Sequence, residues 1–225
     1  MRTIKNVVVD FEFCKVNKKQ RSLTGTHLYQ EIIEFGAIML DENMNVIGKF
    51  QKFVKPQYGT VSAFISNLTG IAPDMLEEEQ PFNKVLTEFL QWIGNTDFQI
   101  ASWSMSDYRQ LYEEICDKCA DEDYSYIFDG WRDIQREFGD RIGYKAALSL
   151  ENAMSAIDER FEGKAHDALV DAENTALLVS LLADKKQFDI RTKTMQELLK
   201  PSEEEGTTLG SMFGDLFAEW GYALG

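Results

Sequence analysis

Apolar residues near the start of the chain stand in three short runs, which predict β-strands. The run NVVVDFEF, residues 6–13, is rich in β-branched and aromatic residues, as is typical of a buried strand. EIIEFGAIML, residues 31–40, predicts a second strand, and KFQKFVKP, residues 49–56, alternates as a third and ends at Pro56. Because their connections are short, the three strands are expected to form an antiparallel meander.

Beyond residue 80 the apolar spacing becomes that of helices. The helix predicted over 81–94 carries one apolar stripe, formed by Phe82, Val85, Leu86, Phe89, Leu90 and Ile93. FQIASW, residues 98–103, predicts a short buried strand. A helix is predicted over 106–119, in which Ser106 is a candidate cap and Asp107 suits the first turn.

The later elements alternate between short strand and helix patterns. The order β-β-β-α-β-α-β followed by helices predicts a mixed α/β sheet around one core. The remaining predicted elements are a strand over 125–129 and helices around 131–139, 147–158 and 168–183.

The composition changes near residue 185, where polar and acidic segments lead to PSEEEG. We therefore expect one domain over 1–184 and a C-terminal tail over 185–225. The tail carries an amphipathic stripe that predicts a helix packing back on the domain, with association with a partner or a second copy as the alternative. Its apolar residues are Leu209, Met212, Phe213, Leu216, Phe217 and Trp220.

Hydrophobic residues make up 44% of the chain and charged residues 27%, which is typical of a soluble globular protein. No apolar run approaches the roughly 20 residues that cross a bilayer, so no membrane association is expected. Three cysteines give no disulfide framework, and the first residues do not resemble a signal peptide, so we expect a reducing, cytoplasmic location. The helical pair Cys116 and Cys119 lacks the further ligands of a zinc site.

The formal net charge of −15 does not favour a protein that follows a nucleic-acid backbone, since such proteins usually present a basic face. Charge alone slightly favours a small-molecule or protein partner. An acidic chain can still act on nucleic acid where the attraction is local or is supplied by bound cations.

Two carboxylates interrupt the first predicted strand. Asp10 and Glu12 are two residues apart, so both side chains leave the same face of the strand. Unpaired acids in a buried strand would be costly. One interpretation places them at an exposed strand end, paired with the basic segment KVNKKQR, residues 15–21; the other is a metal site in which a hard cation neutralises both.

Three further polar residues stand at the starts of predicted helices. Asp107 opens the helix after FQIASW, and Asp171 lies one turn into the helix that Asp167 is expected to cap. Each position also suits plain capping. His166 precedes the cap and is therefore free of helical geometry, so it can face the same space as Asp171. An α/β sheet can bring such strand and helix ends together at one edge.

The ordered set of D-x-E on a first strand, Asp at a strand-to-helix junction and H-x-x-x-x-D at a late helix resembles the DEDDh group of 3′→5′ exonucleases. The resemblance covers about residues 5–183 and includes VVVDFEF, EIIEFGAI, NLTGI, ASWSMSD and HDALVDAENTALL. It implies a ribonuclease H-like fold, a mixed five-stranded sheet with helices on both faces. Trp103 stands where proofreading members often carry Asn, and this resembles the branch that trims structured RNA.

The resemblance implies metal-dependent release of nucleoside monophosphates from single-stranded 3′ ends, with RNA favoured over DNA. Asp10, Glu12, Asp107 and Asp171 would hold two Mg²⁺ or Mn²⁺ ions, which suits oxygen ligands and the charge of phosphodiester hydrolysis. His166 would accept the proton of the attacking water. The alternatives are a catalytically silent binding module and a phosphohydrolase acting on small nucleotides.

The resemblance also implies residues that contact the terminal nucleotide. These candidates are Phe13, Leu68, Thr69 and Trp103, with core packing as the alternative for Phe13 and Leu68. The basic segment offers phosphate contacts, with an exposed solvated loop as the alternative. Its candidate residues are Lys15, Lys18, Lys19 and Arg21.

Overall fold

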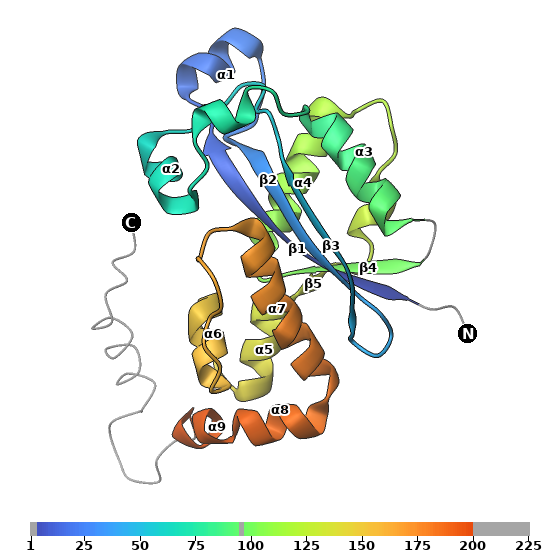
Figure 1. The fold of residues 1–225 in the computed structure, drawn as a ribbon, viewed down its shortest axis with the longest axis vertical. Helices are drawn as coiled ribbons and strands as arrows, with labels where there is room; N and C mark the ends of the chain where they lie inside the picture. The colour runs from blue at the N-terminus through green and yellow to red at the C-terminus, as the bar shows by residue number, and fades with distance from the viewer. Residues whose placement is uncertain (1–3, 95–96, 200–225) are drawn as a thin grey trace.

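The computed structural model describes residues 4–94 and 97–199, which form a mixed five-stranded sheet with helices on both faces (Figure 1). The strands lie in the order β3-β2-β1-β4-β5. The meander β1–β2–β3 is antiparallel, whereas β4 and β5 add in parallel to β1. The strands are β1 (Lys5–Lys15), β2 (Gln30–Leu40), β3 (Val46–Phe53), β4 (Phe98–Ser102) and β5 (Arg132–Asp133). The predicted fold class is confirmed.

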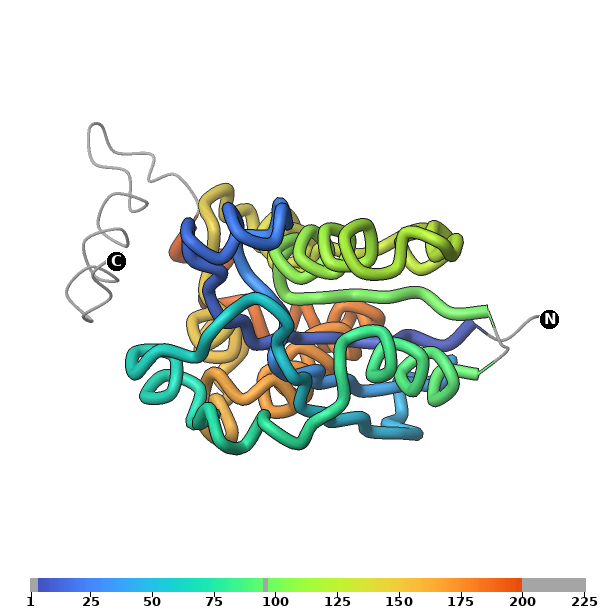
Figure 2. Tube along the Cα trace, turned by 90° about the horizontal axis from the view of Figure 1, so that it is seen from above, coloured from blue at the N-terminus to red at the C-terminus, as the bar shows by residue number. Residues whose placement is uncertain are grey.

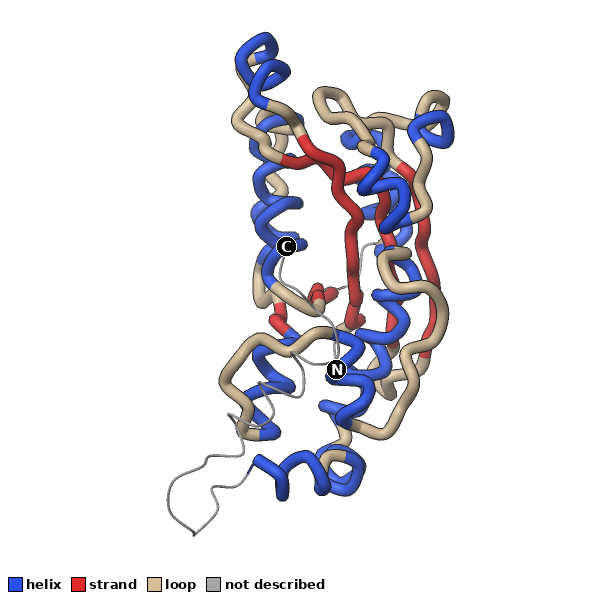
Figure 3. The backbone as a smooth tube through the Cα atoms, turned by 90° about the vertical axis from the view of Figure 1, so that its left-hand side faces the viewer, coloured by secondary structure: helices blue, strands red, loops and turns tan. Residues whose placement is uncertain are grey.

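Two helical layers cover the sheet, α3 and α4 on one face and α5, α6 and α7 on the other (Figures 1 and 3). The helices and 3₁₀ turns are α1 (Lys18–Thr24), α2 (Ala63–Thr69), η1 (Pro73–Leu76), α3 (Phe82–Ile93), α4 (Met105–Lys118), η2 (Ser125–Phe128), α5 (Ile134–Ile142), α6 (Leu150–Ala156), α7 (Ala168–Ala183), α8 (Lys185–Arg191) and α9 (Lys193–Leu199).

The apolar run of β1 is buried on both faces because β1 is the central strand (Figure 2). Val7 and Val9 pack into the cluster with α3 and α4, and Val8 into the cluster with α5 to α7. By this alternation Asp10 and Glu12 belong to the face that α7 covers. The sheet therefore holds the two acids at its centre and points them toward α7.

The predicted strand over 125–129 is wrong. Residues 125–128 form the 3₁₀ turn η2, with only Ile127 buried, and the fifth strand is the two-residue β5 that follows. A short apolar run does not by itself distinguish a strand from a turn that buries one side chain. The strand ladder continues instead where Arg132 and Asp133 pair with the end of β4.

Two local predictions at helix starts are corrected by the structure. The basic segment does not remain a loop, because α1 forms with Asn17 as its cap and Gly25 in the left-handed conformation at its end. Ser104, not Ser106, caps α4. Ser106 lies inside the first turn, where its backbone N–H donates to the Ser104 hydroxyl.

Residues 185–199 form α8 and α9 and lie against the domain. Phe188 is fully buried in the cluster that α5 and α7 build. The domain boundary at residue 184 stays a prediction, and the amphipathic segment predicted over 209–220 lies outside the described residues. Within the described part of the chain, no helix combines the length and the apolar character that crossing a membrane requires.

Candidate active site

All five residues of the D-x-E, Asp and H-x-x-x-x-D pattern line one cavity of about 670 Å³. They come from the centre of β1, the first turn of α4, the first turn of α7 and the residue before the α7 cap. They are Asp10, Glu12, Asp107, His166 and Asp171. Residues more than 150 positions apart in the sequence therefore share one cavity.

Parallel pairing of β1 and β4 brings Asp107 to the acids of β1. Val9 pairs with Ser102, the last residue of β4, and α4 begins three residues later. Asp107 is 4% exposed, and its Oδ1 accepts a hydrogen bond from the backbone N–H of Phe11 at 3.1 Å. This bond fixes the carboxylate beside the backbone between Asp10 and Glu12.

The start of α7 supplies the remaining two residues. Asp167 caps the helix by accepting from the backbone N–H groups of Leu169 and Val170, as predicted. His166 has a left-handed backbone, with φ of 64°, and its own N–H donates to Asp171 Oδ2 at 3.2 Å. Its Nδ1 lies 3.9 Å from Glu12 Oε1. The turn therefore directs the imidazole to the acids of β1.

The carboxylates of the cavity share a strongly acidic, buried environment that opposes their ionisation. Burial first, and then repulsion from the neighbouring acids, raises the pKa of Glu12 to about 8 and that of Asp10 well above its usual range. Burial also raises the pKa of Asp107 to about 7, against the opposing effect of the Phe11 N–H, and that of Asp171 to about 6. Four ionised acids at neutral pH require a compensating positive charge here.

The donor set fits a divalent cation. Ligand atoms of Glu12, His166 and Asp171 all lie within 4.8 Å of one another. Asp171 Oδ1 is buried and accepts no hydrogen bond from the described residues. Carboxylate oxygens are the ligands that hard cations such as Mg²⁺ and Mn²⁺ prefer.

The alternative that Asp10 and Glu12 form ion pairs with the basic segment is wrong. Across residues 4–94 and 97–199, no Lys or Arg nitrogen lies within 4.0 Å of either carboxylate. The described Lys and Arg side chains therefore form no ion pair with these acids.

The predicted substrate contacts divide into two groups. Phe13, Leu68, Trp103 and Lys15 line the cavity. A hydrogen bond also fixes the side chain of Trp103, because its indole N–H donates to the carbonyl of Leu148 at 3.2 Å. Phe13 and Leu68 are half-buried, so each packs on the domain and still presents a surface to the cavity.

The other predicted contacts are not among the residues that line the cavity. Thr69 is buried, and its hydroxyl donates to the carbonyl of Ile65. Lys18, Lys19 and Arg21 lie on α1, where the Arg21 guanidinium stands 3.8 Å from the centre of the Tyr29 ring. Contact between these residues and a substrate stays a prediction.

Sequence reasoning missed two residues of this region. Phe64 is 67% exposed and lines the cavity one helical turn before Leu68, so helical spacing from Leu68 would have identified it. Glu34 is 2% exposed and is the cross-strand partner of Glu12. Like Asp10, it is an acid within an apolar strand, and that signal was present in EIIEFGAIML.

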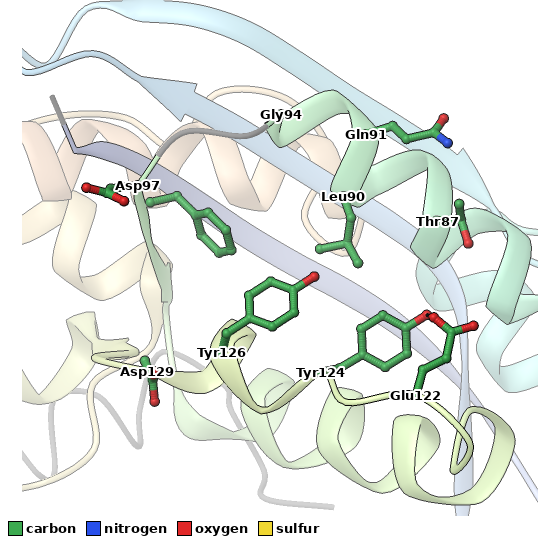
Figure 4. A pocket seen from close by; sticks show the side chains of 10 residues that line it. Thr87, Leu90, Gln91, Gly94, Asp97, Glu122, Tyr124, Tyr126 and Asp129 are labelled. Atoms are coloured by element: carbon green, nitrogen blue, oxygen red, sulfur yellow. Dashed lines mark hydrogen bonds between the residues drawn. The ribbon is translucent and has the colours of Figure 1, made fainter. Parts of the chain in front are cut away.

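A second cavity of about 890 Å³ lies between α3, the start of β4 and η2 (Figure 4). Tyr126 points toward Leu90 across it, and its ring centre lies 6.3 Å from that of Phe98. The Tyr124 hydroxyl donates to Glu122 at 2.7 Å. None of the predicted catalytic or substrate-contact residues lines this cavity. The smaller carboxylate cavity is therefore the candidate active site.

Comparisons with known proteins identify the family and the fold of the chain. A family model described as "Exonuclease" (RNase_T) matches residues 7–179. The Danio rerio protein "ERI1 exoribonuclease 2" is 29% identical over 223 residues, which is 87% of this chain and 38% of that protein. The chain spans between 27% and 38% of the length of the first curated relatives it matches.

Solved structures show the same fold. The nuclease domain of 3′hExo, described as a DEDDh family member bound to rAMP, superposes with a TM-score of 0.68 at 22% identity over 82% of this chain and 94% of that one. A zinc-bound complex of E. coli ExoI with single-stranded DNA superposes with a TM-score of 0.60 at 15% identity over 88% of this chain and 46% of that one.

Proposed function

Because this chain belongs to the exonuclease family whose model spans residues 7–179, we propose that it is a metal-dependent 3′→5′ exonuclease. It releases nucleoside monophosphates from single-stranded 3′ ends, with RNA favoured over DNA. The observation that supports this most strongly is the convergence of four buried or partly buried acids and one histidine in a single cavity. We place this activity in the cytoplasm, consistent with the few cysteines of the chain.

Asp10, Glu12, Asp107 and Asp171 would hold two Mg²⁺ or Mn²⁺ ions through carboxylate oxygens. When bound, such a pair of cations activates water and neutralises the charge that develops on the transferred phosphate and the departing 3′-oxygen. The β1 acids lie on the central strand, and Asp107 is fixed by the Phe11 N–H, so the site is arranged before substrate arrives.

His166 is the proton acceptor in this proposal. Its side chain is half exposed, whereas Glu12 and Asp107 are buried, so it can contact both the cavity and the solvent. A neutral imidazole at this position takes the proton from the attacking water and passes it to solvent. The left-handed backbone at His166 and its N–H bond to Asp171 hold the ring at the cavity mouth.

Phe13, Leu68 and Trp103 receive the terminal nucleotide in this proposal. They supply apolar and aromatic surface along the same cavity as the acids, and base stacking on such surfaces tolerates any sequence. Lys15 at the cavity rim offers a cation to the phosphate backbone. The preference for RNA rests on Trp103 and on the relatives named as exoribonucleases.

The test is digestion of 5′-end-labelled single-stranded RNA and DNA oligonucleotides of one sequence, with Mg²⁺ or Mn²⁺, with and without a 3′-phosphate. The proposal predicts stepwise shortening from an unblocked 3′ end, faster for RNA, and none with a chelator. Internal cutting, shortening from the 5′ end, or binding without metal-dependent cleavage would contradict it; the last result would indicate a silent binding module.

A further inference from the structure

Glu34 is a buried acid that the proposed mechanism does not use. It lies on the side of β2 that faces α7, in line with Ile38 and Leu40, which pack with α7 in the core. Glu34 is 2% exposed, and it lies opposite Glu12 of β1 in the register of the two strands. An acid at such a position is costly unless its oxygens accept hydrogen bonds.

Both oxygens of Glu34 accept hydrogen bonds. Oε2 accepts from the backbone N–H of Ala168 at 3.3 Å, and Oε1 accepts from the side-chain amide of Gln51 at 2.8 Å. Ala168 is the first residue of α7, where the N–H has no partner within the helix. The carboxylate therefore fills an open donor at the helix start, where negative charge is also favoured.

Two more contacts attach the first turn of α7 to the sheet. The amide of Gln51, on β3, also lies 3.4 Å from Oδ1 of Asp167, the α7 cap. Gly36 brings the β2 backbone against the helix so closely that an added Cβ would stand 2.1 Å from the carbonyl carbon of Ala168. The turn is thus held to β2 and β3 at three points.

The attached turn carries the two α7-side residues of the candidate active site. His166 lies two residues before Ala168 and Asp171 three residues after it, and the His166 N–H bonds to Asp171. The distance of 3.9 Å between His166 Nδ1 and Glu12 Oε1 depends on how the start of α7 lies relative to β1. Glu34 sits between these elements, since it pairs with Glu12 and bonds to Ala168.

We propose that Glu34 is a positioning residue, which holds the start of α7 so that His166 and Asp171 face Glu12. This inference rests on the proposed nuclease function for its effect on rate, but the geometry it describes is independent of that function. Glu34 does not itself contact the reacting atoms in this scheme.

Two substitutions separate the roles of shape and charge. Glu34→Ala removes both acceptors and frees the Ala168 N–H. Glu34→Gln keeps the contact with Ala168 through its carbonyl, and its amide donates to the oxygen of a rotated Gln51 amide, so that of the three attachment points only the 3.4 Å contact between Gln51 and Asp167 is lost. We expect Glu34→Ala to lower kcat roughly 10- to 100-fold, as for other residues that orient ligands, with little change in KM, and Glu34→Gln to restore kcat to within about fivefold of wild type.

The matched control is Glu114→Ala. Glu114 is also a fully buried acid bonded to the β2 backbone, through the N–H of Ile32, and it contacts Lys118 away from the cavity. Its loss should lower the melting temperature but leave kcat per folded molecule unchanged. If Glu34→Ala does not fold, Gln51→Ala serves in its place, with Lys52→Ala on the opposite side of β3 as control, because Lys52 pairs with Glu88 of α3.

A second readout does not depend on activity. The chain has two histidines, so the imidazole resonances of His166 and the exposed His27 can be compared in the NMR spectrum of the metal-free protein. Glu34→Ala, or Gln51→Ala, should shift or broaden the His166 ring signal and leave the His27 signal in place. Glu34→Gln should return the His166 signal toward its wild-type position.

An unchanged His166 signal in Glu34→Ala, or equal losses of kcat in Glu34→Ala and Glu114→Ala, would overturn the positioning role. Failure of Glu34→Gln to restore the His166 signal would do the same. Absence of nuclease activity in the wild-type protein would instead contradict the proposed function, and the NMR comparison would still decide the role of Glu34.

Discussion

Asp10 and Glu12 show how single residues carry functional information in this chain. They interrupt an apolar strand at the centre of the sheet, where burial and mutual repulsion raise the pKa of both carboxyl groups. A fold gains no stability from such acids on their own. A cation bound in the cavity would account for their presence in a buried strand, and the donor set of Glu12, His166 and Asp171 fits one.

At the scale of one residue, His166→Ala tests the proton acceptor. We expect the rate of phosphodiester cleavage to fall roughly 10²- to 10⁴-fold, because a general base is lost, while the four acids still bind metal. The measurements are single-turnover cleavage and a Mn²⁺ titration. His27→Ala, an exposed residue on the loop after α1, is the control and should be neutral. Cleavage near the wild-type rate in His166→Ala would show that the histidine is structural.

At the scale of elements, the strands and helices with a long regular pattern could be predicted from the sequence. The run of β1, the apolar stripe of α3 and the Asp167 cap of α7 all follow from local spacing. The strand expected over 125–129 could not be assigned correctly, because Ile127 is the one buried residue of that segment and Phe128 is only partly buried. Pairing of Arg132 with β4 depends on the position of the whole sheet.

The same distinction applies to the site. The five residues could be identified from type and order, since each stands at a strand centre or a helix start. The distances between these residues could not be predicted from the sequence, because they depend on how β4 and α7 lie against β1. Phe64 was missed although helical spacing indicated it, and the contacts of Glu34 are visible only once α7 lies on β2.

Gly36→Ala tests the attachment of α7 to β2. The added Cβ would overlap the backbone of Ala168 at 2.1 Å, so the helix has to move away from the sheet. We expect both a lower melting temperature and a lower kcat, measured on the same preparation. Gly48→Ala on β3, where an added Cβ comes no closer than 3.2 Å to the Trp92 side chain, should retain kcat. Normal kcat in Gly36→Ala would show that the position of α7 does not control the site.

Substitutions on helix α1 test how much electrostatic attraction contributes to substrate binding. Lys18 and Lys19 are exposed and have no carboxylate partner among the described residues. Replacing both with Glu should raise KM for long oligonucleotides severalfold and weaken its salt dependence, because fewer phosphate counterions are released. A dinucleotide, which does not extend beyond the cavity, should be cleaved at the wild-type rate. Equal effects on both substrates would place the defect in the catalytic cavity instead.

For the whole molecule, the acid cluster couples stability to pH and metal. The pKa values of Glu12, Asp107 and Asp171 are raised in the folded state to about 8, 7 and 6, from ordinary values near 4. The folded protein therefore holds more protons than the unfolded chain between about pH 4 and pH 8. Its stability without metal is highest at the acidic end of this window and falls as the pH rises through it.

Thermal unfolding in a chelator at pH 5 and pH 8 measures this effect. The melting temperature should be higher at pH 5, and added Mg²⁺ or Mn²⁺ should raise it at pH 8, because the cation binds the folded state. In Asp10→Asn, the loss of one titratable carboxyl group from the cluster should reduce both the pH dependence and the shift with metal. A wild-type melting temperature that does not change when metal is added at pH 8 would be inconsistent with the cation site.

The wild-type protein and Asp10→Asn, compared on one 5′-labelled single-stranded RNA with Mg²⁺, test the central claim most directly. The five converging residues predict a ladder of products shortened from the 3′ end, together with released nucleoside monophosphates, for the wild type. They predict intact RNA for Asp10→Asn, which removes one of the proposed metal ligands from an otherwise folded protein. Equal ladders from both proteins, or none from the folded wild type, would contradict the assignment of this cavity as a nuclease active site.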